Sequence, residues 1–227
     1  MEIPPLAYID IHKHQHFMDE EVIAIRNYFP SEKGAIGKQN KWFSIGIHPW
    51  HIKDDSEQDV KTLLDQLKIN KPFAIGEIGL DKRTATLFEL QKEVFIRQLE
   101  IAKKLNLPVI IHAVRSFQEL LSIKKDIAEE ACWIFHGFRK SKALAEELIK
   151  NNAYLSFGEA LFYDKNLQKV FKACPLDKLF LETDESEHSI QDIYRKAAQL
   201  KEVSLEFLKE SLFSNFTSIL KEHKLVE

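Results

Sequence analysis

The sequence contains little cysteine, glycine or proline: its 227 residues include 2 cysteines, 7 glycines and 7 prolines. Cys132 and Cys174 are far apart and lack the spacing of a metal-binding pair, which favours reduced thiols packed inside a protein. No stretch has the composition of a linker, and no internal repeat or low-complexity tract is present. Nothing therefore indicates a domain boundary, and we expect a single domain over residues 1–227.

Long apolar runs and an excess of one charge are also missing. No segment approaches the roughly 20 apolar residues of a membrane span, and the N-terminus lacks the basic start and apolar stretch of a signal peptide. The formal net charge is -3, so any nucleic-acid binding would depend on a local basic patch. These absences predict a cytoplasmic protein without a membrane association, and they leave its oligomeric state open.

The sequence does contain eight short apolar runs of about six or seven residues, a pattern typical of buried parallel strands. We expect strands at Leu6–His12, Val22–Tyr28, Trp42–His48, Phe73–Gly79, Pro108–Ala113, Cys132–Gly137, Ala153–Gly158 and Leu179–Asp184. The second run is the hardest to assign, because Glu20–Tyr28 could also form a short helix.

Helical patterns separate the later runs. They span Leu87–Leu105, Phe117–Glu129, Lys142–Lys150, Asn166–Ala173, Gln191–Leu200 and Ser204–Glu222, with Ser204 as a predicted N-cap. Only about nine residues separate the first two strands, and Pro30–Lys41 has no helical period. We therefore predict an α/β TIM (β/α)8-type barrel with shortened or missing helices in the first two crossovers.

Histidines and carboxylates stand at the carboxyl ends of five predicted strands. A parallel barrel brings these ends together on one face, where catalytic residues of this architecture lie. One histidine at the end of a strand is more often a structural residue than a ligand, but a set of this size indicates a metal site. The predicted metal ligands are His12, His14, Glu77, His112, His136 and Asp184.

The types and spacing of these residues suit two metal ions. His12 and His14 are two residues apart on a strand, so their side chains point to the same side and could hold one ion. Glu77 could bridge two ions, which would stabilise both the attacking and the leaving oxygen of a displacement. We expect Asp184 and Glu77 to be catalytic, with Asp184 accepting a proton from the attacking water.

Other residues after the predicted strands are candidates for substrate binding. His48 ends the third strand and Arg115 follows the fifth, where its guanidinium could bind a phosphate or a carboxylate. Each could equally be a packed or a solvated side chain. Four aromatic residues follow predicted strands and could either stack on nucleic-acid bases or pack in the protein, namely Trp50, Phe138, Phe162 and Tyr163.

The order of the motifs resembles the TatD-type metal-dependent deoxyribonucleases, over about Tyr8 to Leu220. The motifs are His-x-His at His12, Gly-Glu-Ile-Gly-Leu-Asp at Gly76, Leu-Pro-Val-Ile-Ile-His ending at His112, Phe-His-Gly-Phe at Phe135, Glu-Thr-Asp ending at Asp184, and Asn215-Phe216. The resemblance implies an amidohydrolase-like barrel and two divalent metal ions, Mg, Mn or Zn. It further implies hydrolysis of DNA phosphodiesters, often from the 3′ end, with single-stranded DNA or 3′ ends as the substrate.

In such enzymes, one ion would be held by His12, His14, Glu77 and Asp184, and the other by Glu77, His112 and His136. The chain differs from the family pattern in the loops between His14 and Ile47 and after Asp184, which line the predicted mouth. Two other functions therefore stay open: an amidohydrolase-type enzyme acting on a small amide, lactone or phosphoester, and a catalytically silent binding module.

Overall fold

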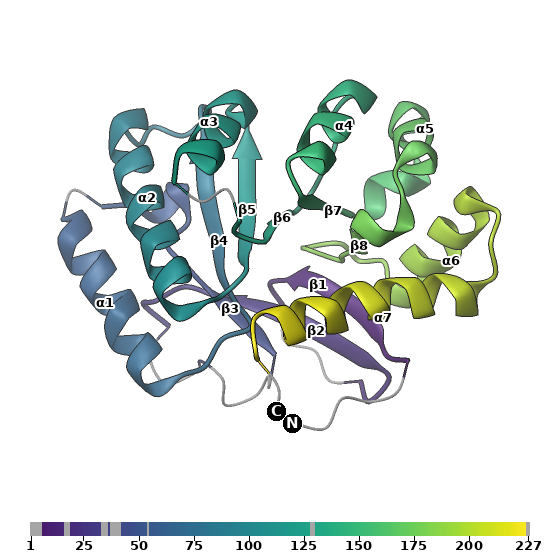
Figure 1. Cartoon of the computed structure of the whole chain (residues 1–227), viewed down its shortest axis with the longest axis horizontal. Coiled ribbons are helices and arrows are strands. Elements are labelled where there is room, and N and C mark those ends of the chain that lie inside the picture. The colour runs from purple at the N-terminus through teal and green to yellow at the C-terminus, as the bar shows by residue number, and fades with distance from the viewer. Residues whose placement is uncertain are drawn as a thin grey trace. The chain divides into compact units, whose positions relative to one another are not determined.

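The computed structural model describes residues 6–15, 19–32, 36, 42–53, 55–127 and 130–225. Eight parallel strands follow one another in the sheet in the order in which they occur in the sequence (Figure 1). They are β1 Tyr8–Lys13, β2 Val22–Tyr28, β3 Phe43–Ile45, β4 Ala74–Asp81, β5 Val109–Val114, β6 Trp133–Phe135, β7 Ala153–Phe157 and β8 Leu179–Leu181. The eight predicted strands are confirmed, and the ambiguous run Val22–Tyr28 is a strand.

The helices follow the sequence prediction with one addition. They are α1 Ser56–Ile69, α2 Phe88–Leu105, α3 Phe117–Ile127, α4 Lys142–Lys150, α5 Lys165–Ala173, α6 Ile190–Lys201 and α7 Leu205–Glu222, with the 3-10 helices η1 Pro49–His51, η2 Glu159–Phe162 and η3 Leu176–Lys178. Ser204 caps α7 by accepting the N–H of Phe207. The predicted end of α3, at Ala128 and Glu129, lies outside the described residues.

Helix α1 was not predicted, although the sequence carries its signals. Asp55 accepts the N–H of Gln58 as the N-cap, and Val60 and Leu63 form part of a buried helical stripe. In the described part of the first two crossovers, no helix joins β1 to β2 or β2 to β3. The predicted lack of helices there is confirmed for those residues, while much of Pro30–Lys41 lies outside them. No helix in the described ranges is long and apolar enough to cross a membrane.

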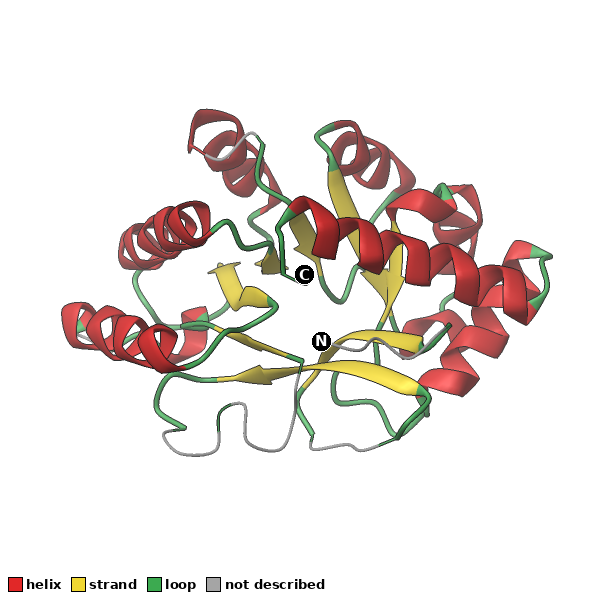
Figure 2. Ribbon diagram, turned by 60° about the horizontal axis from the view of Figure 1, so that its bottom comes forward, coloured by secondary structure: helices red, strands yellow, loops and turns green. Residues whose placement is uncertain are grey.

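The chain divides into two compact units. The first consists of Met1–Ile25 and Phe135–Glu227, and the second of Arg26–Ile134. Within each unit, helices pack against one side of the strands (Figure 2). The expectation of a single domain over residues 1–227 stays a prediction.

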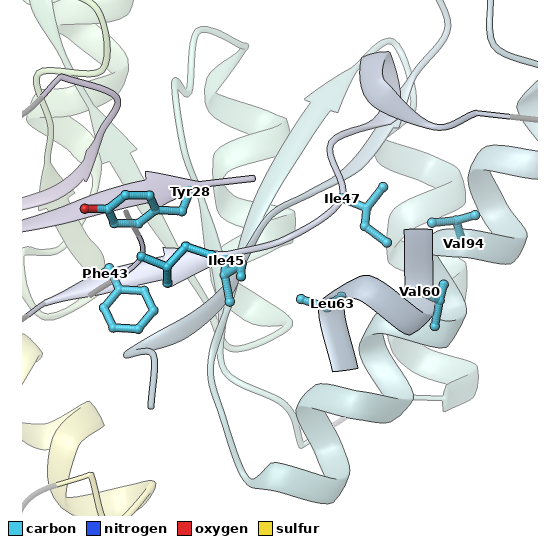
Figure 3. Close-up of a cluster of buried hydrophobic side chains, with 8 residues drawn as sticks. Tyr28, Phe43, Ile45, Ile47, Val60, Leu63 and Val94 are labelled. Carbon is cyan, nitrogen blue, oxygen red and sulfur yellow. The ribbon is translucent and has the colours of Figure 1, made fainter. Parts of the chain in front are cut away.

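In the second unit, β3, β4 and β5 pair in parallel, and β2 joins them through Arg26, which lies opposite Phe43. Helices α1 and α2 contact each other, and α2 contacts β4. Figure 3 shows the cluster of buried side chains between the strands and these helices, in which strand residues such as Ile45 face helix residues such as Leu63. Apolar burial of this kind fixes the strands, and hence the residues at their carboxyl ends.

In the first unit, β7 and β8 pair in parallel, and both α6 and α7 contact β1. The Tyr194 hydroxyl on α6 donates to the carbonyl of Ile9 at 3.2 Å and accepts its N–H at 3.0 Å. The Asn215 amide on α7 donates to the carbonyls of Leu176 and Leu179, where β8 begins. The near-terminal Asn215 of the sequence motif therefore positions a strand.

Candidate metal centre

The second unit carries a group of two histidines and a carboxylate. His48 follows β3, Glu77 lies in β4 and His112 lies in β5, and their ligand atoms are all within 4.8 Å of one another. Glu77 Oε1 lies 2.7 Å from His112 Nδ1 and 3.3 Å from His48 Nε2. Imidazole nitrogens and carboxylate oxygens are ligands of divalent metal ions, so this donor set fits a metal.

The buried surroundings of Glu77 fix its place on β4. The Glu77 N–H donates to Asn27 Oδ1 at 2.5 Å, and the same oxygen accepts the Ser44 hydroxyl at 3.1 Å. One side-chain oxygen from β2 therefore links β3 and β4 at the height of the carboxylate. Fixing a ligand by its backbone in this way lowers the cost of holding it in position.

A close approach of two strands at Gly79 brings His112 beside Glu77. Gly79 has φ +151°, and a Cβ atom there would lie 1.9 Å from the His112 carbonyl oxygen. Only glycine fits such a contact. The second glycine of the Gly-Glu-Ile-Gly motif is thus explained by the packing of β4 against β5.

His112 lies between two carboxylates. Its Nε2 atom is 3.3 Å from Asp81 Oδ2, opposite the contact of its Nδ1 atom with Glu77. The Trp50 indole N–H also donates to Asp81 Oδ2, at 2.6 Å, and the Gln91 side chain binds the Asp81 backbone. A ligating histidine commonly donates its other ring N–H to a carboxylate, which orients the ring, and Asp81 is placed for this role.

Asp81 is ionised although it is buried. Burial raises the pKa of its carboxyl group, but the hydrogen bonds from Trp50, from the Arg83 N–H and from His112 together hold the pKa below its usual range. Asp81 is the last residue of the Gly-Glu-Ile-Gly-Leu-Asp motif, and no role was predicted for it from the sequence. Its position four residues after Glu77 on a β-strand, and so on the same face as Glu77, was the available signal.

His48 is oriented as a hydrogen-bond donor toward Glu77. Its Nδ1 atom accepts the Trp50 backbone N–H at 3.2 Å, which leaves the ring proton of the neutral form on Nε2, the atom that faces Glu77. Burial lowers the pKa of His48, against the opposing effect of Glu77, so the neutral form is favoured. This orientation suits a positioning or substrate-contacting residue more than a metal ligand.

The first unit carries a second group of ligand atoms within 4.8 Å of one another, from His12, His136 and Asp184. Asp184 Oδ1 lies 3.8 Å from His12 Nε2 and 3.5 Å from the Nε2 atom of His14. The rings of His12 and His136 are 4.4 Å apart between centroids. Three histidines and one carboxylate also fit a divalent metal ion.

The backbone of β1 holds Asp184 in place. The Asp184 N–H donates to the His12 carbonyl at 2.9 Å, and the His14 N–H donates to the Asp184 carbonyl at 3.4 Å. Asp184 itself has φ +54°, a left-handed conformation that aspartate adopts more readily than most residues. Both backbone groups of Asp184 are therefore tied to the end of β1, while its side chain is 41% exposed.

Buried carboxylates support the first-unit group. Glu182 Oε1 accepts the Gly137 N–H at 2.6 Å and lies 3.7 Å from His136 Nδ1. Burial raises the pKa of Glu182, but His136 and His12 more than offset this and keep its pKa below the usual range. The ionised carboxylate therefore stabilises and orients the imidazoles next to it.

A second buried network lies directly before Asp184. Thr183 donates from its N–H and its hydroxyl to the two carboxylate oxygens of Asp10, at 2.8 and 2.7 Å, and its hydroxyl accepts from Lys13 Nζ at 3.1 Å. Burial raises the pKa of Asp10 to about 7 in spite of the bonds from Thr183. Residues next to the predicted ligands His12, His14 and Asp184 are thus buried and hydrogen-bonded to one another.

Five of the six predicted ligands belong to these two groups, and the sixth, His14, contacts Asp184. Their assembly into a single six-residue site draws on both units and stays a prediction. Arg115 directly follows β5 and is exposed, with φ +54°, so its proposed contact with substrate also stays a prediction. Among the four aromatic candidates, Phe138 is buried against Phe157, Phe162 is half-buried and stacks on His188 at 4.2 Å, and Trp50 and Tyr163 are exposed.

Comparison with solved structures supports the barrel fold. The crystal structure of YJJV, a TatD homolog from Escherichia coli K12, has a TM-score of 0.81 with 23% identity, over 93% of this chain and 97% of that one. An uncharacterized amidohydrolase from Saccharomyces cerevisiae has a TM-score of 0.75 with 15% identity, over 95% of this chain and 100% of that one. The predicted α/β TIM-barrel fold is confirmed.

Sequence comparison identifies the family. The uncharacterized metal-dependent hydrolase YabD of Bacillus subtilis is 35% identical over 190 residues, 79% of this chain and 74% of that protein. The human 3′-5′ RNA nuclease TATDN2 is 32% identical over 150 residues, 63% of this chain and 20% of that protein. The family model for TatD related DNase matches residues 31–221. The chain therefore belongs to the TatD-related DNase family of metal-dependent hydrolases.

Proposed function

We propose that this chain is a metal-dependent nuclease that hydrolyses phosphodiester bonds of single-stranded DNA from the 3′ end. The observation that carries the proposal is that each unit contains a group of histidine and carboxylate ligand atoms within 4.8 Å of one another. Two metal sites are typical of enzymes that cleave phosphodiesters. The family description and the nuclease among the relatives support the same chemistry.

Each unit would hold one divalent ion. In the second unit Glu77 and His112 are the ligands, with His48 beside them, and in the first unit His12, His136 and Asp184 are the ligands, with His14 in reach. The mixture of imidazole and carboxylate suits Zn and Mn, and the carboxylates suit Mg. When bound, such ions neutralise charge on the phosphate oxygens and lower the pKa of water.

The chain's own residues would position the substrate and move the proton. The Asp184 side chain is 41% exposed, so its carboxylate is accessible to water and accepts the proton of the attacking water molecule. Arg115 would donate hydrogen bonds to the phosphate, and His48, whose Nε2 atom faces Glu77, would help to position that carboxylate. Asp81 and Glu182 would keep the histidine rings oriented, because each carboxylate faces a ligating imidazole.

The proposal is tested by hydrolysis of a 5′-labelled single-stranded oligodeoxynucleotide with added Mg or Mn. Native protein is compared with Glu77→Ala, with a chelator control, and with Asp192→Ala as a surface carboxylate control. Stepwise shortening from the 3′ end that is lost in Glu77→Ala and with chelator supports the proposal.

No cleavage by folded, metal-loaded native protein would overturn the nuclease assignment. The protein would then be assayed with small amide, lactone and phosphoester substrates, which amidohydrolase-like barrels also accept. An RNA oligonucleotide of the same sequence separates a preference for RNA from one for DNA.

A further inference from the structure

A cavity lies beside η1 in the second unit, and the proposed chemistry does not use it. Its volume is about 770 Å³, within the usual range for pockets that bind small molecules. The ends of β2 and β3, η1 and the first turns of α1 line it, through residues that include Phe29, Trp50, His51, Lys53 and Thr62. We refer to it as the η1 cavity.

Aromatic rings form one wall of the η1 cavity. Phe29 and His51 pack edge to face with ring centroids 4.6 Å apart. Trp50 is 61% exposed, yet its indole N–H is fixed on Asp81 Oδ2 at 2.6 Å. An exposed aromatic ring held in one orientation loses little entropy when a flat ligand stacks on it.

Polar side chains form another part of the lining. Gln58 donates from Nε2 to the Thr62 hydroxyl at 3.3 Å on the exposed first turns of α1. Asp59 accepts the Lys53 N–H at 3.2 Å, and the exposed Lys53 contributes a positive charge. An amide and a hydroxyl can bind the polar edge of a base, and an ammonium group can bind a phosphate.

Trp50 connects the η1 cavity with the metal group of the second unit. Asp81, which accepts the Trp50 indole N–H, lies 3.3 Å from His112 Nε2. The rings of Trp50 and His112 are 6.1 Å apart between centroids, and those of Trp50 and His48 are 5.2 Å apart. A ligand stacked on Trp50 would therefore be next to the residues proposed to act on the phosphate.

We infer that the η1 cavity binds one nucleotide of the single-stranded substrate, with its base stacked on Trp50 and its phosphate near Lys53. This inference rests on the proposed nuclease function and names the substrate-binding residues for it. Stacking accepts every base, because each base has an aromatic face. The stacking contact on Trp50 would therefore hold the strand without selecting its sequence, and any preference for a base would come from Gln58 and Thr62.

Fluorescence titration with a phosphorothioate octathymidylate, which resists hydrolysis, tests the inference. The chain has three tryptophans, and Trp42 and Trp133 are buried, so stacking should quench mainly Trp50. Trp50→Ala should weaken binding about 5- to 150-fold, as expected for the loss of one base–aromatic stack. Binding by this variant is followed by anisotropy of a labelled oligonucleotide.

Three controls separate stacking from other effects. Trp50→Phe keeps an aromatic face but loses the bond to Asp81, so binding should change less than about threefold while turnover falls. Phe207→Ala removes an exposed aromatic ring on α7 and should leave binding unchanged. An abasic oligonucleotide of the same length should bind native protein as weakly as the normal oligonucleotide binds Trp50→Ala.

The cleavage assay on the same preparations distinguishes the two proposals. If native protein cleaves DNA but Trp50→Ala binds the oligonucleotide as tightly as native protein, the inference is wrong and the nuclease function stands. If native protein binds the abasic oligonucleotide as tightly as the normal one, the inference is also wrong and the nuclease function stands. If native protein cleaves neither DNA nor RNA, the proposed nuclease function is wrong, and the inference, which rests on it, is wrong as well.

Discussion

The two candidate metal-binding groups, His48, Glu77 and His112 in the second unit and His12, His136 and Asp184 in the first, differ in how other residues hold them in place. In the second unit the side chains of Glu77 and His112 are 4% and 12% exposed, and a buried shell of Asn27, Asp81 and Gln91 fixes them through hydrogen bonds. In the first unit His12 is fully buried, while the Asp184 side chain is 41% exposed. The second-unit group is enclosed, and the first-unit group presents its carboxylate to solvent.

The difference suggests a division of roles. An enclosed ligand set holds an ion in a fixed position with little reorganisation. An accessible carboxylate can exchange a proton with water, which a fully buried one cannot do easily. We therefore expect the second-unit group to act mainly in binding and orientation, and Asp184 to take part in the proton transfer as well.

The largest expected effect comes from Asp184→Asn, which keeps the size of the side chain but removes its basic oxygen. Because Asp184 is also a proposed metal ligand, the variant is assayed at saturating metal and its bound metal is counted by elemental analysis. Turnover of the oligonucleotide should then fall about 10²- to 10⁴-fold, the usual contribution of a general base. Steady-state kinetics measures this effect, and circular dichroism checks the fold. A variant with more than a tenth of native turnover would remove Asp184 from the proton transfer.

Removing one histidine from each group should remove one ion. Native protein should bind two ions per chain after dialysis against metal, and His112→Ala and His136→Ala should each bind one. His48→Ala should still bind two, because the His48 Nδ1 atom accepts the Trp50 N–H and its Nε2 atom is left as a donor. Elemental analysis gives the stoichiometry. A single ion in His48→Ala would make His48 a ligand and contradict its assigned orientation.

A smaller effect is expected from Asp81→Asn, which changes the partner of His112 without touching a ligand. Metal affinity should fall about 10- to 100-fold, as for other residues that orient a ligating histidine. Calorimetric titration of the metal-free protein measures the affinity, with Asp192→Asn on the surface of α6 as the control. Unchanged affinity would mean that the Asp81 contact does not orient His112.

The smallest effect is expected from Tyr194→Phe in the first unit. The variant loses the hydroxyl that donates to the Ile9 carbonyl and accepts its N–H. Because Ile9 is buried and loses this partner, the free energy of unfolding should fall by about 1–3 kcal/mol. Metal affinity should stay within about threefold, because the backbone bonds between His12 and Asp184 are retained. Urea unfolding and calorimetry measure the two quantities. A larger loss of affinity would show that the first-unit group depends on α6.

The sequence by itself determined the eight strands and six of the helices, and it predicted most of the histidines and carboxylates that lie close together within each unit. Buried parallel strands are apolar at successive positions, and the prediction of a site came from the number of histidines and carboxylates that follow such runs. Helix α1 was missed because its apolar stripe, around Val60 and Leu63, is interrupted by many charged residues. Its N-cap Asp55 and its spacing were nevertheless present in the sequence.

Only the tertiary structure decided the roles of residues that act through others. Asn27, Asp81 and Gln91 belong to different elements, and no motif in the sequence indicates that they act together. Their role in holding Glu77 and His112 follows from hydrogen bonds that involve β2, β4, β5 and α2. The orientation of His48 depends on one backbone N–H, and the aromatic wall of the η1 cavity joins β2 to η1. A sequence pattern records the spacing along one strand, whereas these contacts depend on the register and packing of several elements.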